Sequence, residues 1–305
     1  MKLDEVLREV SDLRGQLQEL RVRVEAFRTA FFLDSSLLLR RLKGRGLKIH
    51  GQNPPDRLLI PSDLSPELSS DFYERMKRYS FRLFLRDLVK TEGAFRPDDL
   101  TRYCSSRIAD EYTQFLDSTG TVSRLRDNRY RLDRLEVSSF GPTLEWFVAQ
   151  IFQREFACPA IFGVRFKETD SGGDYDVLAI WEGRLVYVEV KSSPPKSIEA
   201  PEIGAFFSRL YDLIPDVAFF FNDTHLRMKD KVLEIFRQEM ERARGALAFS
   251  HPPEKLLDEM YHVNHRIYIL NSKRDIVANF TTCLRDHLRT CGVKPVDRLS
   301  FYSPQ

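Results

Sequence analysis

The chain has 305 residues, 42% of them hydrophobic, which is enough for two or three domains with their own cores and excludes an intrinsically disordered protein. Lysine and arginine total 47 against 45 acids, so a net charge of +2 predicts neither strong attraction to nucleic acid nor repulsion from it. The four cysteines lack the spacing of a disulfide framework or a zinc knuckle, and no apolar run is long enough to span a bilayer. We therefore expect a soluble, cytoplasmic protein whose nucleic-acid contacts, where present, come from local basic clusters.

Apolar residues recur through the first 31 positions at alternating spacings of three and four, with charged residues between them. This pattern predicts a coiled-coil helix and favours a parallel homodimer. An amphipathic helix packed on the chain's own body also fits, because Leu7, Gly15 and Val22 lie off the apolar seam. We assign 1–48 to this helical segment and the proline-rich stretch 49–71 to a linker. The seam residues are Leu3, Val6, Val10, Leu13, Leu17, Leu20, Val24, Phe27 and Phe31.

A second module is predicted over 72–137. Helical patterns at 72–92 and 107–118, with a short helix between them that begins near Pro97, precede a β-hairpin around an Asp-Asn turn. This order resembles a winged helix, which implies nucleic-acid binding through the third helix and the hairpin. The third helix is acidic, so a module that contacts a partner protein fits almost as well. The hairpin is basic, and we expect its arginines to contact phosphates. These wing arginines are Arg124, Arg126, Arg129 and Arg131.

Two adjacent strand patterns at 174–181 and 184–191 carry charges inside apolar, β-branched sequence. They meet at a Glu-Gly dipeptide, which predicts a hairpin with a tight turn. If Trp181 pairs with Arg184, the positions of paired residues are fixed along both strands. The register can therefore be counted from the sequence.

In this register Asp176 lies opposite Glu189, and Asp174 lies opposite Lys191, all four on one face, while the valines point to the core. Two facing carboxylates repel, so we expect a cation between them. A hard divalent ion is the natural candidate: Mg²⁺, with Mn²⁺ as a substitute. Beside such an ion a lysine can hold an attacking water or stabilise charge on a phosphoryl oxygen. The alternative is a solvated strand face on which Asp174 and Lys191 form an ion pair.

An acid before an apolar strand, followed by Glu-Val-Lys at 189–191, resembles the PD-(D/E)XK nuclease superfamily. The resemblance covers about 138–300 and implies that Asp176 and Glu189 bind the metal and that Lys191 is the catalytic lysine. It further implies that Glu145, on the predicted helix 140–152, is an additional catalytic and metal-binding acid, and that Asp174 is an extra acid nearby. The proline that the family places before the aspartate is Tyr175 here.

Beyond 191, predicted strands alternate with predicted helices, and 245–264 is interpreted as an insertion. The expected fold class is therefore α/β: a restriction-endonuclease-like mixed sheet flanked by helices over 138–305, preceded by a winged-helix-like module and a coiled-coil helix. The resemblance implies a Mg²⁺-dependent endonuclease that hydrolyses phosphodiester bonds in DNA, in restriction, defence or repair. The alternative function is a non-catalytic scaffold that binds nucleic acid or a partner protein.

Overall fold

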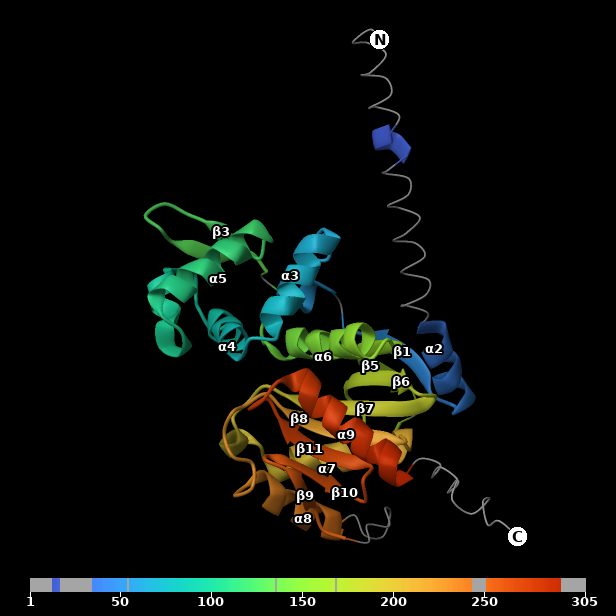
Figure 1. Ribbon diagram of the computed structural model, residues 1–305. Coiled ribbons are helices and arrows are strands. Elements are labelled where there is room, and N and C mark those ends of the chain that lie inside the picture. The colour runs from blue at the N-terminus through green and yellow to red at the C-terminus, as the bar shows by residue number, and fades with distance from the viewer. Residues whose placement is uncertain are drawn as a thin grey trace, which may run out of the picture.

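A computed structural model describes residues 13–16, 35–53, 55–134, 136–167, 169–242 and 251–291. The predicted coiled-coil seam, apart from Leu13, lies outside these residues. The described chain forms a large mixed α/β layer structure and, beside it, a smaller helical module with a short sheet of its own (Figure 1). Among the described helices, none has the length and apolar character needed to cross a membrane.

The large part is built on an eight-stranded mixed sheet with the order β1-β5-β6-β7-β8-β11-β10-β9. Strand β8 runs parallel to its two neighbours, β7 and β11. Every other adjacent pair in the sheet is antiparallel. The strands are β1 (Lys48–Gln52), β5 (Ala160–Lys167), β6 (Tyr175–Trp181), β7 (Arg184–Lys191), β8 (Val217–Asn222), β9 (Glu254–Leu257), β10 (Met260–Val263) and β11 (Ile267–Asn271).

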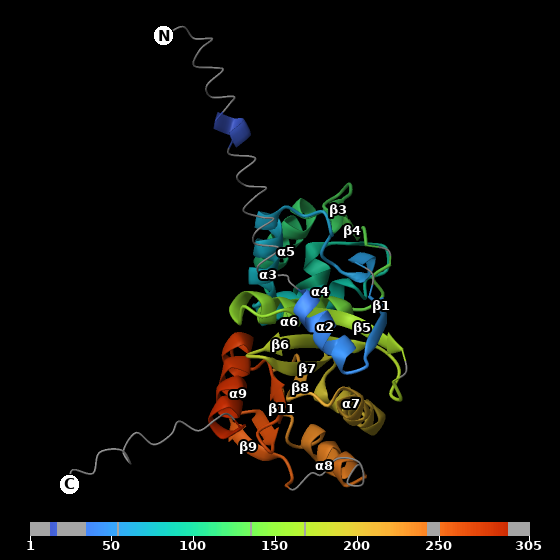
Figure 2. The ribbon, with the colours of Figure 1, turned by 90° about the vertical axis from the view of Figure 1, so that its right-hand side faces the viewer.

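Helices cover both faces of this sheet (Figure 2). On one face lie α6 (Gly141–Glu155) and α9 (Ile276–Cys291), which bury Phe152 and Phe280 in the larger core. On the other lie α2 (Ser35–Gly44), α7 (Ala200–Leu213) and α8 (Val232–Arg242), which bury Leu38, Phe206 and Phe236 in the second core. Because β6 and β7 alternate side chains between two cores, both of their faces are apolar, and polar chemistry is confined to the strand ends. The expectation of one core face and one chemical face is wrong in this respect.

The helical module contains α3 (Pro66–Met76), α4 (Tyr79–Leu88), a 3₁₀ helix (Pro97–Tyr103) and α5 (Ser106–Ser118). Its three-stranded sheet has the order β2-β4-β3, with β2 (Ala94–Phe95), β3 (Val122–Arg124) and β4 (Tyr130–Leu132). The β3–β4 hairpin closes at Asp127 and Asn128, which both have positive φ, as a type I′ turn requires. The short helix expected near Pro97, the helix expected over 107–118 and the hairpin are therefore present in this order.

Three segments differ from the sequence interpretation. Residues assigned to the junction of coiled coil and linker form β1, an edge strand that pairs with β5. The single helical stretch expected over 72–92 is two helices, because the backbone of Arg78 is extended. The segment interpreted as an insertion contains β9 and β10, which extend the sheet beyond β11.

Candidate active site

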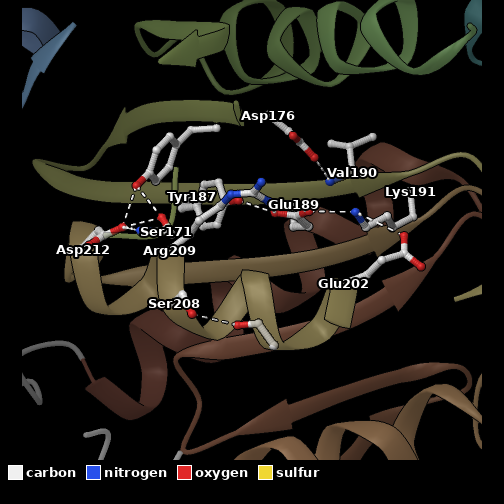
Figure 3. Close-up of polar contacts among 12 residues, drawn as sticks. Ser171, Asp176, Tyr187, Glu189, Val190, Lys191, Glu202, Ser208, Arg209 and Asp212 are labelled. Atoms are coloured by element: carbon white, nitrogen blue, oxygen red, sulfur yellow. Dashed lines mark hydrogen bonds and ion pairs between the residues drawn. The ribbon is translucent and has the colours of Figure 1, made fainter. Parts of the chain in front are cut away.

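The β6–β7 hairpin has the register that was counted from the sequence. Five pairs, from Val177 with Val188 to Trp181 with Arg184, form the antiparallel ladder. Beyond Val177 the ladder ends, and the Asp176 carboxylate accepts the backbone N–H of Val190 at 2.7 Å (Figure 3). The charged residues therefore lie where the two strands cease to pair.

Glu189 is buried, at 1% exposure, and faces α7. Its carboxylate accepts a hydrogen bond from the Tyr187 hydroxyl. Arg209 Nη1 donates to both carboxylate oxygens, at 2.9 Å to Oε1 and 2.8 Å to Oε2. Lys191 Nζ lies 2.8 Å from the same carboxylate. Burial opposes the charged form of Glu189, but the charges of Lys191 and Arg209 outweigh it and lower the pKa of this carboxyl. Glu189 is therefore an ionised acid held by two cations.

Lys191 ends β7 with its ammonium group between two acids. Besides Glu189, its Nζ lies 3.5 Å from an oxygen of Glu202 on α7. Burial favours the neutral amine, but the charge of Glu189 outweighs it, so the pKa of Lys191 is raised. The lysine carbonyl accepts the N–H of Asp223 at 2.8 Å, which fixes the strand end. The side chain is therefore a positioned cation, 18% exposed, at the end of a central strand.

Glu145 and Asp176 have fewer stabilising contacts to cations than Glu189, and their pKa values are raised. Glu145 projects from α6, and Asn53 Nδ2 lies 3.5 Å from its Oε2. Burial, reinforced by the charges of Asp174 and Glu189, raises the pKa of Glu145 to about 7. Burial and the charges of Glu189 and Glu145 raise the pKa of Asp176 well above its usual range. The charges of Glu145, Asp174, Asp176 and Glu189 thus act on one another, which places these acids in one group.

Asp174 lies at the rim of this group and does not pair with Lys191. Its Oδ1 is 3.2 Å from Nε of Arg165 on β5, and both side chains are more than a third exposed. The predicted facing pair of Asp174 with Lys191 is therefore not formed. The reason is the end of the ladder at Val177, which turns the chain before it away from β7.

Four contributing residues were not predicted from the sequence: Asn53, Tyr187, Glu202 and Arg209. Asn53 follows an edge strand that was interpreted as part of a linker, and Tyr187 looks like any aromatic strand residue. Glu202 and Arg209 lie on a helix whose apolar positions alone were recognisable. Their roles depend on where α7 packs, which no local pattern in the sequence reports.

The donor set fits a hard divalent cation in its chemistry, because every candidate ligand is a carboxylate oxygen. Within the residues that the structure describes, no group of three or more His, Cys, Asp or Glu side chains is arranged to hold a metal ion. Both oxygens of Glu189 are already engaged by cations. The arrangement thus fits an ion held by one or two carboxylates and water, a mode that Mg²⁺ favours.

The helical module is anchored beside this site. Arg82 of α4, 1% exposed, donates through Nε and Nη2 to the two oxygens of Asp223 at 2.9 Å each. Tyr79 stacks on His225 with ring centroids 3.6 Å apart. Arg86 Nη1 donates to the Ser192 carbonyl at 3.3 Å. The loops that follow β7 and β8 are therefore bound to α4.

The wing arginines are exposed and lie away from the carboxylates. The β3–β4 hairpin projects from the far side of the helical module (Figure 1), so its basic surface is separate from the ends of β6 and β7. Arg131 forms an ion pair with Asp133 at 3.7 Å. On α5, the exposed Glu111 pairs with Arg75 of α3 at 2.9 Å, so part of the acidity of this helix is neutralised within the module.

No protein-family profile matches the sequence, and no curated protein is significantly similar to it. Two solved structures are similar in outline. VC1899 from Vibrio cholerae aligns with a TM-score of 0.42 and 13% identity over 72% of this chain and 58% of its own. Can2 from Sulfobacillus thermosulfidooxidans, solved in complex with cyclic tetra-adenylate, aligns with a TM-score of 0.38 and 10% identity over 82% and 60%. The chain thus spans less than two thirds of the length of either protein.

Proposed function

We propose that this chain is a metal-dependent nuclease of the PD-(D/E)XK type that hydrolyses phosphodiester bonds in DNA. The observation that carries the proposal is the meeting of Glu145, Asp176, Glu189 and Lys191 at the ends of two central strands, where the β6–β7 ladder ends. Acids with raised pKa values beside a positioned lysine are typical of a catalytic site rather than of a solvated strand.

In the proposed reaction, each side chain has a distinct task. Asp176 and Glu145 would hold a divalent cation together with water, while Glu189, whose two oxygens contact Arg209 and Lys191, would lie beside the ion. When bound, this ion lowers the pKa of a coordinated water and polarises a phosphoryl oxygen. Lys191 orients the attacking water and stabilises negative charge on the phosphoryl group. Glu189 keeps Lys191 in place, because their 2.8 Å contact aligns the ammonium group at the strand end.

The remaining expectations extend this proposal. The wing arginines would bind the DNA backbone, and the N-terminal coiled coil would pair two copies of the chain. Restriction, defence and repair are the settings in which such an assembly would act. DNA, rather than RNA, is proposed on the resemblance alone.

One observation favours a second function, that of a non-catalytic scaffold. The Glu189 carboxylate contacts Tyr187, Lys191 and Arg209. Side chains of the chain itself therefore balance the charge of this acid. In this alternative, the helical module binds nucleic acid or a partner protein, and the sheet supports it.

Metal-dependent cleavage separates the two functions. Purified protein is incubated with supercoiled plasmid and with single-stranded DNA, in Mg²⁺, Mn²⁺ or EDTA, alongside Lys191→Ala and Asp176→Asn. We expect cleavage by the wild type with either metal, none in EDTA, and a loss of at least about 100-fold in both variants. Lys196→Ala is the matched control, since Lys196 is an exposed lysine five residues further on.

Equal cleavage by the wild type and both variants would remove this site from the reaction. A wild type that cuts neither substrate under any of these conditions supports the scaffold instead. Thermal unfolding of each variant shows whether a loss of cleavage reflects the loss of the fold.

A further inference from the structure

The guanidinium of Arg209 uses only one of its edges within the protein. Nη1 donates to both oxygens of Glu189, at 2.9 and 2.8 Å. Nε is buried and has no hydrogen-bond partner, and Nη2 makes no hydrogen bond to any residue that the structure describes. The Nε–Nη2 edge is the fork with which arginine binds carboxylate and phosphate in a bidentate manner. This edge beside Glu189 therefore has no acceptor within the described residues, and it is reached from its Nη2 side, because Nε is buried.

The loop at 170–174 is bound to α7 next to this open edge. Asp212, on the same helix, accepts the N–H groups of Asp170 and Ser171 at 3.2 and 3.1 Å and the Tyr175 hydroxyl at 2.8 Å. The Arg209 guanidinium lies over the Tyr175 ring, 5.8 Å from its centroid. The loop and the arginine are thus held in one fixed arrangement.

Gly173 leaves room at that edge. Its φ is +74°, and a Cβ at this position would lie 3.1 Å from Arg209 Nη2. Gly172 also has a positive φ, +57°, but a Cβ there would meet nothing within 4 Å. Both glycines are exposed, so the space beside Nη2 is near the surface.

The nearby acids do not supply an acceptor for this edge. Asp174 is paired with Arg165, and Asp212 is occupied by the loop. A buried donor without a partner is costly, so its acceptor is expected from outside the protein. The acceptor that matches a guanidinium fork beside an active site is a group with two oxygens on one centre.

We propose that the Nε–Nη2 edge of Arg209 binds the non-bridging oxygens of a nucleic-acid phosphate and sets that phosphate next to Glu189 and Lys191. The inference rests on the proposed function in taking a nucleic acid as the substrate. It assigns Arg209 two partners at once: Glu189 through Nη1 and the phosphate through the opposite edge. A role limited to neutralising Glu189 would use Nη1 alone.

Binding of DNA in EDTA tests the proposal without cleavage. Affinity for a fluorescent DNA duplex is measured over a series of NaCl concentrations for the wild type, Arg209→Gln, Gly173→Ala and Gly172→Ala. We expect Arg209→Gln to bind about tenfold more weakly and to lower the slope of log K against log salt by about one, as the loss of one phosphate contact requires. Gly173→Ala crowds Nη2 and weakens binding, whereas Gly172→Ala imposes similar backbone strain without crowding and retains affinity.

Unchanged affinity and salt slope in Arg209→Gln, with only a lower melting temperature, would reduce Arg209 to a counter-ion of Glu189 and overturn the inference. Equal binding by the two glycine variants would do the same, and this comparison remains valid if Arg209→Gln fails to fold. Because no metal is present, the result is independent of whether the wild type cleaves DNA. A protein that cuts DNA but shows unaltered binding in these variants refutes this inference alone.

Discussion

The raised pKa of Glu145 makes protein stability depend on pH in an unusual direction. A glutamate of ordinary pKa, 4.5, that titrates at about 7 in the folded protein binds its proton more tightly when folded. The folded state therefore holds more protons than the unfolded state between these values, and stability falls as the pH rises through this window. The interval corresponds to about 3 kcal/mol for a single carboxyl group. Metal-free protein should thus be more stable at pH 5.5 than at pH 8.

Glu145→Gln removes the charge and keeps the size of the side chain. At pH 8 in EDTA we expect the variant to be more stable than the wild type by up to about 3 kcal/mol, or roughly 5 °C in melting temperature for a protein of this size. At pH 5 the difference should fall towards zero, because the wild-type carboxyl is then protonated. Differential scanning fluorimetry from pH 5 to 8.5 measures both profiles.

Glu155 on the same helix is a matched control, because its pKa is shifted in the opposite direction. Burial raises its pKa, but hydrogen bonds from Lys77 and Tyr73 outweigh burial and lower it. Glu155→Gln should therefore lose stability at neutral pH, and the loss should shrink as the pH falls. Parallel pH profiles for the wild type and Glu145→Gln, or a less stable Glu145→Gln at pH 8, would refute the reasoning.

Three further predictions concern the rest of the molecule. Replacing all four wing arginines with serine should weaken DNA binding and reduce the slope of log K against log salt by about 3 to 4. The control, Arg237→Ser with Arg242→Ser on α8, should leave the affinity and this slope unchanged. An unaltered slope in the wing variant would exclude the wing from DNA binding. Asp223→Asn should cost about 3–5 kcal/mol in urea unfolding, because it leaves the buried charge of Arg82 without its counter-ion, whereas an apolar replacement of both partners should recover much of the loss; an unchanged stability of Asp223→Asn would contradict this. Removing residues 1–33 should convert a dimer to a monomer in light scattering, and an unchanged mass excludes the coiled-coil dimer.

The sequence predicted the structure best where the structure depends on residues that are close together in the chain. The β6–β7 register followed from a two-residue turn and side-chain alternation, and both depend on neighbours in the chain. Counting along the two strands was therefore enough to predict that Asp176, Glu189 and Lys191 lie close together. Adding Glu145 required the resemblance, since its helix is remote from the hairpin in sequence.

The contacts around these residues depend on packing and were not predictable. β1 has a polar sequence with alternating exposure, as an edge strand allows, and carries no apolar signal. Its position is what brings Asn53 to Glu145. In the same way, Arg209 reaches Glu189 only because α7 crosses the sheet at β7. Long-range placement of this kind leaves no periodic trace in a sequence.

The buried pair of Arg82 and Asp223 fixes the distance between the helical module and the candidate active site. It joins the helical module to the strand end beside Lys191, so the wing is held at a constant offset from that lysine. If the chain cleaves DNA as proposed, a duplex that contacts both the wing and Lys191 would be cut at a constant number of base pairs from the wing. A rigid connection between the two parts would give fragments of one length whatever their sequence, and a loose connection would give a range of lengths.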